Sequence, residues 1–243
     1  MGTTIVVMRI AAVFLAIFSV LVFSINPVFA KSPSPSASPS ATLDPGKLEV
    51  GDALISPASS LYFLKALRER IEMMFSNDNE VKAHRQLEFS VRRLREVKSL
   101  IEENRQDLIE ETLERYKDEI KQLSSLSFRD DKLKETLGAS VARHLYVLQT
   151  LYLQVNEKGA KRAVRATIQE LMDFNKKLLS EMEDKTLKNA LMEKTALRQA
   201  AACQFLAGEV TSADLNEPEK QILKEYVDMC QKDSLKSGTI PSK

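Results

Sequence analysis

The two cysteines of the chain, Cys203 and Cys230, have a spacing that restricts what they can do chemically. They do not form the Cys-x-x-Cys pair that lowers a thiol pKa for redox catalysis. Both fall on segments with helical periodicity, and residues 208–215 are enough to fold those segments back as an antiparallel hairpin. A bridge between them can form outside the cytoplasm, and the apolar residues 10–25 at the start of the chain predict that the protein is exported. We therefore predict a structural disulfide, with two free buried thiols or an intermolecular bridge as the alternatives.

A second group with possible chemistry is Glu80, His84 and Glu88, which recur every four residues and so share one helix face. Imidazole and carboxylate ligands suit a transition metal, if His144 or acids from another helix complete the site. The repeated Glu-x-x-His spacing of di-iron helical bundles is absent. A solvated face with ordinary ion pairs explains the same pattern. We expect no metal and no cofactor, and keep these three residues as the candidates if a metal is bound.

Basic residues gather on about one helical face at Lys158, Lys161, Arg162 and Arg165. Such a face could meet an anionic wall polymer or lipid headgroups. The whole chain, however, balances 35 basic residues with 34 acidic ones. This balance favours an ordinary solvated face, and it argues against a nucleic-acid partner.

Signatures of catalysis are missing from the sequence. It contains no glycine-rich phosphate loop, no strand-turn-helix nucleophile elbow and no His-Glu-x-x-His, and only two histidines could serve as bases. We expect a protein that is not an enzyme and has no catalytic residues.

The placement of proline and glycine indicates the fold class. Residues 58–217 contain no proline, and only Gly138, Gly159 and Gly208 interrupt them. A sheet protein of this size would need many more turn residues. The sequence predicts an all-α fold of six to seven helices in an elongated or bundled antiparallel array, ending in a helical hairpin.

Apolar residues at three- and four-residue steps predict the buried stripe of each helix. Ser56 and Pro57 are typical of a helix start, and a stripe of six apolar residues follows them. Gly138 lies inside a predicted helix, where it allows a close crossing. The main predicted stripes are Leu61, Leu64, Leu67, Ile71, Met74 and Phe75; Ile109, Leu113, Tyr116, Ile120 and Leu123; Val164, Ile168, Leu171, Asn175, Leu178 and Met182; and Leu187, Leu191, Leu197, Ala201 and Phe205.

The first residues carry the features of an export signal: Arg9, the apolar run 10–25, and small residues at Val28 and Ala30. The run is shorter than the roughly 20 residues of a typical span, so cleavage after Ala30 is favoured over a membrane anchor. We predict a signal peptide or N-terminal anchor at 1–30, a Pro/Ser-rich disordered linker at 31–54, a helical domain at 55–233 and a disordered tail at 234–243.

Two segments carry a resemblance to a known family: SPASSLYFLKALRERIEMMF (56–75) and EVKAHRQLEFSVRRLREV (80–97). Together they resemble the opening of an exported bacterial helical domain family of unknown function. The stretches AACQFLAGEV and LNEPEK are similar to the tails of some members. The resemblance implies an extracytoplasmic, all-helical protein, and it implies no catalytic residue.

These observations lead to an expected function. We expect an exported, non-enzymatic interaction or structural module of the cell envelope, secreted, periplasmic or displayed at the cell surface. Its partner would be an envelope protein or a second copy, with membrane contact only through residues 5–25 if these are retained. The alternatives are a chaperone-like or ligand-binding envelope protein and, less favoured, a metal-dependent helical enzyme built on the Glu80, His84 and Glu88 face.

Overall fold

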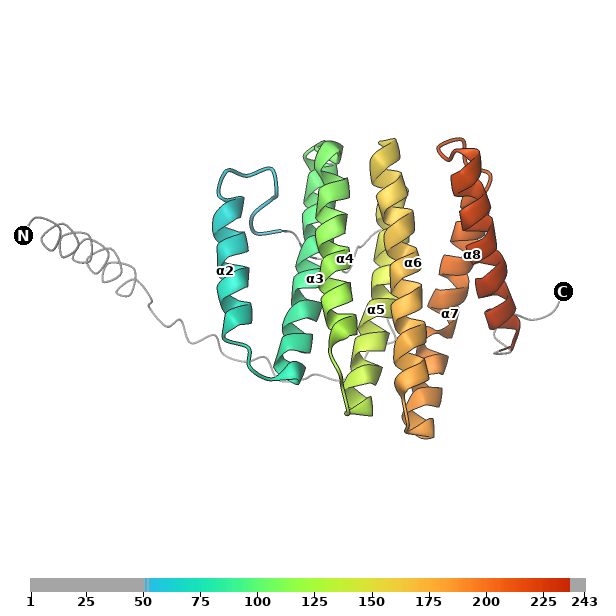
Figure 1. Cartoon of the computed structure of the whole chain (residues 1–243). Helices are drawn as coiled ribbons and strands as arrows, with labels where there is room; N and C mark the ends of the chain where they lie inside the picture. The colour runs from blue at the N-terminus through green and yellow to red at the C-terminus, as the bar shows by residue number, and fades with distance from the viewer. Residues whose placement is uncertain (1–50, 52, 237–243) are drawn as a thin grey trace, which may run out of the picture. The chain divides into compact units, whose positions relative to one another are not determined.

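The computed structural model describes residues 51 and 53–236, and the regular structure of this part is entirely helical (Figure 1). Within it lie seven α-helices and one short 3-10 helix. They are α2 (Tyr62–Met74), α3 (Asn79–Glu102), η1 (Gln106–Leu108), α4 (Ile109–Ser125), α5 (Asp131–Tyr152), α6 (Lys158–Glu181), α7 (Lys185–Glu209) and α8 (Glu217–Lys236). The all-α class and the C-terminal hairpin, α7 followed by α8, are confirmed.

Carboxylates mark the starts of four helices. Asp78, Asp130, Glu157 and Asp184 each accept a hydrogen bond from a backbone N–H of the first turn of α3, α5, α6 and α7 respectively. Such a cap satisfies a donor that has no partner inside the helix, and it places negative charge at the positive end of the helix dipole.

Helix α8 begins with a capping box. The N–H of Glu219 donates to Asn216 Oδ1 at 2.9 Å, and the N–H of Asn216 donates to Glu219 Oε2 at 3.0 Å. The spacing of these two residues in the sequence is typical of this motif, which satisfies two backbone donors reciprocally.

Helices α3 to α8 form three consecutive hairpins that stack side by side. Contacts within the hairpins join α3 to α4, α5 to α6 and α7 to α8, while contacts between hairpins join α3 to α5, α5 to α7 and α4 to α6. The helices therefore lie in two layers, with α3, α5 and α7 in one and α4, α6 and α8 in the other. Each hairpin buries its apolar side against the next, as in helical repeat proteins.

The core runs between the two layers through α4, α5 and α6. All five residues of the predicted α4 stripe, from Ile109 to Leu123, are fully buried. The predicted α6 stripe from Val164 to Met182 is buried throughout, including the polar Asn175. In these helices the apolar spacing correctly identified the core face.

Gly138 lies in α5 where this helix crosses α7. A Cβ atom built at this position would be 2.8 Å from Leu191 Cδ2 and 2.9 Å from Asn175 Oδ1. Both distances are shorter than a normal contact, so the lack of a side chain allows the helices to approach. The predicted close crossing is confirmed.

The prediction for the first helix was wrong in two respects. Helix α2 begins at Tyr62, not at Ser56, because residues 56–60 form turns in which the Ser56 side chain accepts a hydrogen bond from the N–H of Ala58. Its six predicted stripe residues are all exposed, and the buried residue of α2 is Glu69.

The predicted stripe of α7 was also partly wrong. Leu197 is 78% exposed, whereas the buried residues of the helix include Leu191, Thr195 and Ala202. Leu197 lies six positions after Leu191. Six helical steps rotate the side chain by about 240° beyond one full turn, so the two side chains cannot share a face.

Several sequence predictions concern residues outside the described part. The signal or anchor segment 1–30, the linker up to residue 50 and the tail from residue 237 belong to this group. Helix α8 extends to Lys236, a few residues beyond the predicted end of the helical domain. Among the helices described, none has both the length and the hydropathy needed to cross a bilayer.

Candidate functional site

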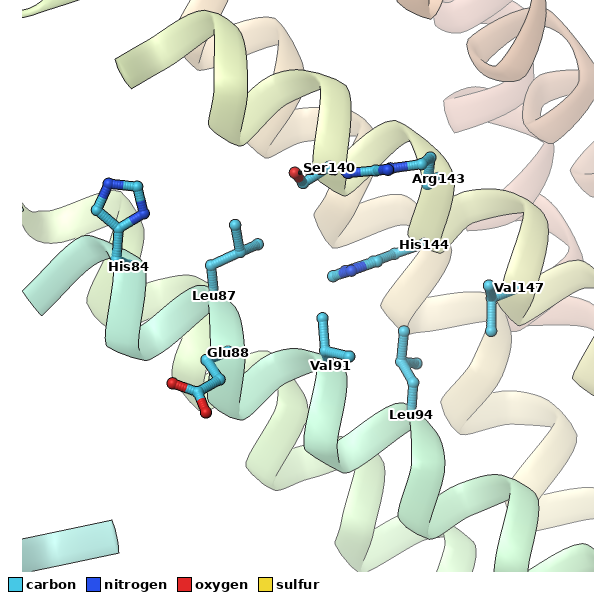
Figure 2. A pocket seen from close by; sticks show the side chains of 9 residues that line it. All are labelled: His84, Leu87, Glu88, Val91, Leu94, Ser140, Arg143, His144 and Val147. Carbon is cyan, nitrogen blue, oxygen red and sulfur yellow. Dashed lines mark hydrogen bonds between the residues drawn. The ribbon is translucent and has the colours of Figure 1, made fainter. Parts of the chain in front are cut away.

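A pocket between α3 and α5 is lined by both histidines of the chain, His84 at one end and His144 further along (Figure 2). Its cavity has a volume of about 330 Å³. Leu87, Val91 and Leu94 form the α3 wall, since they recur at steps of four and three. The remaining lining residues are His84 and Glu88 of α3 and Ser140, Arg143, His144 and Val147 of α5.

His144 lies at the base of this pocket and is 6% exposed. Its Nδ1 is 2.8 Å from the hydroxyl of Tyr116, a fully buried residue of α4, and the two rings meet edge to face. Burial, with a smaller contribution from Arg143, lowers the pKa of His144 to about 4. Burial also raises the pKa of the Tyr116 hydroxyl. The imidazole is therefore neutral at pH 7.

The neutral imidazole gives this pocket the capacity to form a hydrogen bond in apolar surroundings. Among the described residues, no carboxylate contacts His144, and Ser140 Oγ accepts a hydrogen bond from Arg143 at 3.2 Å. The base, orienting acid and nucleophile of a hydrolytic triad are thus not assembled here. The geometry suits binding of a small group between the two helices.

The three metal-ligand candidates do not converge. His84 is exposed at the end of the pocket distant from His144, and the Glu88 carboxylate points away from His144 (Figure 2). Glu88 accepts a hydrogen bond from Arg92 at 2.6 Å and another from Arg85. In the described part of the chain, no three His, Cys, Asp or Glu side chains lie close enough together to hold a metal ion.

Three of the four residues of the predicted basic face of α6 form ion pairs with the α7–α8 region. Lys161 contacts Asp214 at 3.3 Å and Arg162 contacts Glu219 at 2.8 Å. Arg165 is buried, where it contacts Glu209 at 3.0 Å and donates to the hydroxyl of Tyr152 at 2.8 Å. Lys158 is exposed at the start of the helix. Three of the four charges thus hold the last hairpin against α6.

The predicted disulfide is present between Cys203 of α7 and Cys230 of α8. The two Cα atoms are 6.2 Å apart, within the range that a disulfide spans without moving the backbone. The bridge joins the two helices of the last hairpin, as the spacing predicted.

The largest concentration of exposed apolar side chains lies on α2. We call these seven residues, which include the two flanking the helix, the outer face of α2: Leu61, Phe63, Leu64, Leu67, Ile71, Met74 and Phe75. Their exposed fractions range from 45% for Ile71 to 81% for Phe75. Contiguous apolar patches of more than about 300–600 Å² are unusual on a monomer and mark interaction sites.

The opposite side of α2 packs through charges. Arg93 of α3 is the centre of this contact: it pairs with Glu69 of α2, with Glu96 at 2.7 Å and with the Tyr62 hydroxyl at 2.8 Å. Lys65 of α2 also pairs with Glu96, which is fully buried. We call this group, together with Arg92 and Glu119, the charged layer.

Burial or the neighbouring charges raise the pKa values of three groups in the charged layer: Arg93, Tyr62 and Glu119. Burial opposes the charge of Arg93, but Glu96, Tyr62 and Glu69 outweigh it and raise the Arg93 pKa. Burial, followed by the charge of Glu96, raises the pKa of Tyr62 to about 12. Glu119 of α4 is 3.8 Å from Arg93, yet burial dominates and raises its pKa to about 7.

The charged layer was missed at the level of sequence, although a signal for it exists. Tyr62, Lys65, Glu69 and Glu72 recur at steps of three, four and three, so they form a second stripe opposite the apolar one. A helix with one apolar and one charged stripe normally buries the apolar one. In α2 the charged stripe is buried instead, because Arg93 and Glu96 of α3, more than twenty residues later, pair with its side chains.

The fold and its surfaces define a class of protein: a stack of helical hairpins with one terminal helix attached through charges. A family model described as "Domain of unknown function (DUF5667)" matches residues 54–225, which include α2 to α7 and part of α8. The chain belongs to this family. The expected resemblance to a family of unknown function is confirmed to that extent. No curated protein and no solved structure matches the chain.

Proposed function

We propose that this protein is an exported, non-enzymatic interaction module of the cell envelope, and that it binds a helix of a partner protein through α2. The observation that carries this proposal is the exposure of the outer face of α2. The N-terminal apolar segment in the sequence and the disulfide between α7 and α8 support the exported location, since disulfides persist in oxidising compartments.

The spacing on α2 favours a helix as the bound element. Leu64, Leu67, Ile71 and Met74 follow one another at steps of three, four and three, which is the seam of a helix pair. The helix has 13 residues and is therefore about 20 Å long, enough for the anchors of a helix seated on an apolar face. We call these four residues the α2 seam.

The charges beside the α2 seam favour an acidic partner. Arg68 and Arg70 are exposed on its two sides, and Glu69 of α2 is buried. Glu72, whose side chain is 18% exposed, accepts a hydrogen bond from Arg68 at 2.6 Å, so Arg70 is the arginine of this pair that no acid of α2 contacts. Two copies of α2 placed face to face would bring four arginines together, of which the two Arg68 side chains pair with Glu72 of their own helix and the two Arg70 side chains do not. An amphipathic helix with Asp or Glu beside its apolar side would complement them.

Site-specific crosslinking in the native host tests this proposal. A photoreactive residue at position 71 is expected to capture a peptide with an apolar helical stripe and acidic flanks. The same residue at the exposed position 221 of α8 is the control, and it should not capture this peptide. The captured protein, once purified, should bind the wild type, and Leu67→Glu should weaken this binding at least tenfold. Reversing Arg68 and Arg70 to glutamate should weaken it as well.

Leu197→Glu provides the matched control, because it makes the same change at an exposed leucine of α7. Crosslinks between two copies, or to lipid alone, would contradict the proposed partner. Flotation of the domain with vesicles of 30% anionic lipid would also contradict it, if Leu67→Glu abolished that flotation. The intact mass and N-terminal residue of the native protein test the exported location separately: loss of residues 1–30 would support export, whereas their retention fits a cytoplasmic protein or an uncleaved anchor.

A further inference from the structure

A groove between α6, α7 and α8 lies in the last hairpin, away from α2. Its cavity has a volume of about 440 Å³, within the range of small-molecule sites in proteins. Three helices line it: α6 through Met172, Asp173, Asn175, Lys176 and Leu179, α7 through Met192, Glu193, Thr195, Ala196 and Gln199, and α8 through Tyr226, Met229, Cys230 and Asp233.

Covalent and polar contacts hold the three walls in place. The disulfide joins α7 to α8, and Cys230 itself lines the groove. The Tyr226 hydroxyl of α8 donates to Asp173 Oδ1 of α6 at 3.0 Å, and Lys176 of α6 contacts Asp233 of α8 at 2.6 Å. The groove therefore does not depend on a ligand to keep its walls together.

Part of the groove is apolar and adaptable, beside the polar side chains of Asn175, Thr195 and Gln199. Met172, Met192 and Met229, one from each helix, line it together with Leu179. Methionine side chains are flexible and polarisable, so they fit ligands of different shape. Met192 is 37% exposed and Met229 is 59% exposed, which leaves apolar surface open to a ligand.

The charge around the groove is negative. Asp173, Glu193 and Asp233 line it with a single basic residue, Lys176, so the formal charge of the lining is −2. Among the described residues, no ion pair engages Glu193. An anionic amphiphile would be repelled by this net negative charge, whereas a cation would be attracted.

We propose that this groove binds a small apolar molecule that carries one positive charge. The apolar part contacts the three methionines and Leu179, and the cationic group lies beside Glu193 and Asp173. This assignment is independent of the proposed interaction through α2, since the two surfaces share no residue.

Methyl NMR of the protein labelled at methionine tests the assignment. Three probes with the same ten-carbon chain are compared below their micelle concentrations: decyltrimethylammonium, decanol and decanoate. Decyltrimethylammonium is expected to shift the methyl signals of Met172, Met192 and Met229 saturably, and to bind at least tenfold more tightly than decanoate. Met73 and Met74 of α2 are internal controls for non-specific contact with apolar surface.

Variants identify the charged contacts. Glu193→Gln and Asp173→Asn should each weaken decyltrimethylammonium binding roughly threefold to tenfold, because each removes one nearby opposite charge. Glu225→Gln, an exposed acid of α8 that does not line the groove, should leave the affinity unchanged. Ala196→Phe should fill the groove and abolish the methyl shifts; circular dichroism would confirm that it folds.

Three results would overturn the proposal: binding of decanoate as tight as that of the cation, shifts confined to Met73 and Met74, or the absence of any saturable shift. Because Glu193 is exposed, its variant should fold even if Ala196→Phe does not.

Discussion

His144 and Glu119 are two buried titratable groups whose ionisation should affect folding in opposite directions. The pKa of His144 is lowered to about 4, whereas that of Glu119 is raised to about 7, and burial is the main cause of both shifts. Each folded-state value favours the neutral form. The free energy of unfolding should therefore respond to pH through both residues between about pH 4 and 7.

Acidification should destabilise the folded protein through His144. Below its ordinary pKa of 6.5, the unfolded chain takes up a proton that the folded protein takes up only near pH 4. His144→Gln removes this effect. From pH 7.5 to 5, the wild type should lose roughly 2 kcal/mol of stability relative to the variant, measured by urea denaturation. Equal pH dependence of the two proteins would show that His144 does not titrate as proposed.

Acidification should stabilise the folded protein through Glu119. Between pH 7 and its ordinary pKa of 4.5, the folded protein binds a proton that the unfolded chain does not. Glu119→Gln should therefore be more stable than the wild type at pH 8 by on the order of 3 kcal/mol, and most of this advantage should disappear by pH 4.5. A constant difference across that range, in the same denaturation experiment, would contradict the raised pKa.

At the scale of the helices, Gly138 and Gly208 provide a direct test of close packing. Alanine is a better helix former than glycine by up to about 1 kcal/mol. At position 208 a Cβ meets nothing within 4 Å, so Gly208→Ala should raise stability by up to that amount. At position 138 the clash with Leu191 and Asn175 should outweigh this gain, and Gly138→Ala should lower stability by about 1–3 kcal/mol. Thermal denaturation of the two variants, each compared with the wild type, measures the contrast.

The disulfide should stabilise the last hairpin mainly through the unfolded state. Its two cysteines are 27 residues apart, which on the chain-entropy model corresponds to about 3.5 kcal/mol. The double variant Cys203→Ser, Cys230→Ser should lose stability of this order, and reductant should no longer affect its denaturation midpoint. If reductant leaves the wild-type midpoint unchanged, the bridge is not formed in solution.

The helices also show how far the sequence could predict this fold. The stripes of α4 and α6 were identified correctly because each has one apolar face and no competing pattern. In α2 the apolar spacing was equally regular, but the charges of Arg93 and Glu96 determine which face turns inward. The pocket at His144 could not be predicted either, because it requires α3 and α5 to lie side by side although they are separated in sequence by α4.

At the scale of the whole array, stability should be unevenly distributed. Helix α2 contacts the array through few residues, and most of those are charged, whereas α4, α5 and α6 enclose the apolar core. Breaking a buried ion pair leaves the remaining charge without its partner. Hydrogen exchange should therefore be fastest in α2, and Glu69→Ala should accelerate exchange in α2 while leaving α6 unchanged. Equal protection of α2 and α6 would contradict this view of the charged layer.

The outer face of α2 would allow a further helix to be added to the stack. Up to residue 233, α8 exposes mainly charged and polar side chains, with Ile222 and Met229 as exceptions. Helix α2 instead exposes a continuous apolar stripe, of the kind that each hairpin elsewhere covers with the next. The two ends of the stack of described helices therefore differ: the α8 end is mainly polar, and the α2 end presents an apolar stripe on which another helix can pack. A helix bound at α2 would continue the succession as an additional repeat supplied by a different chain.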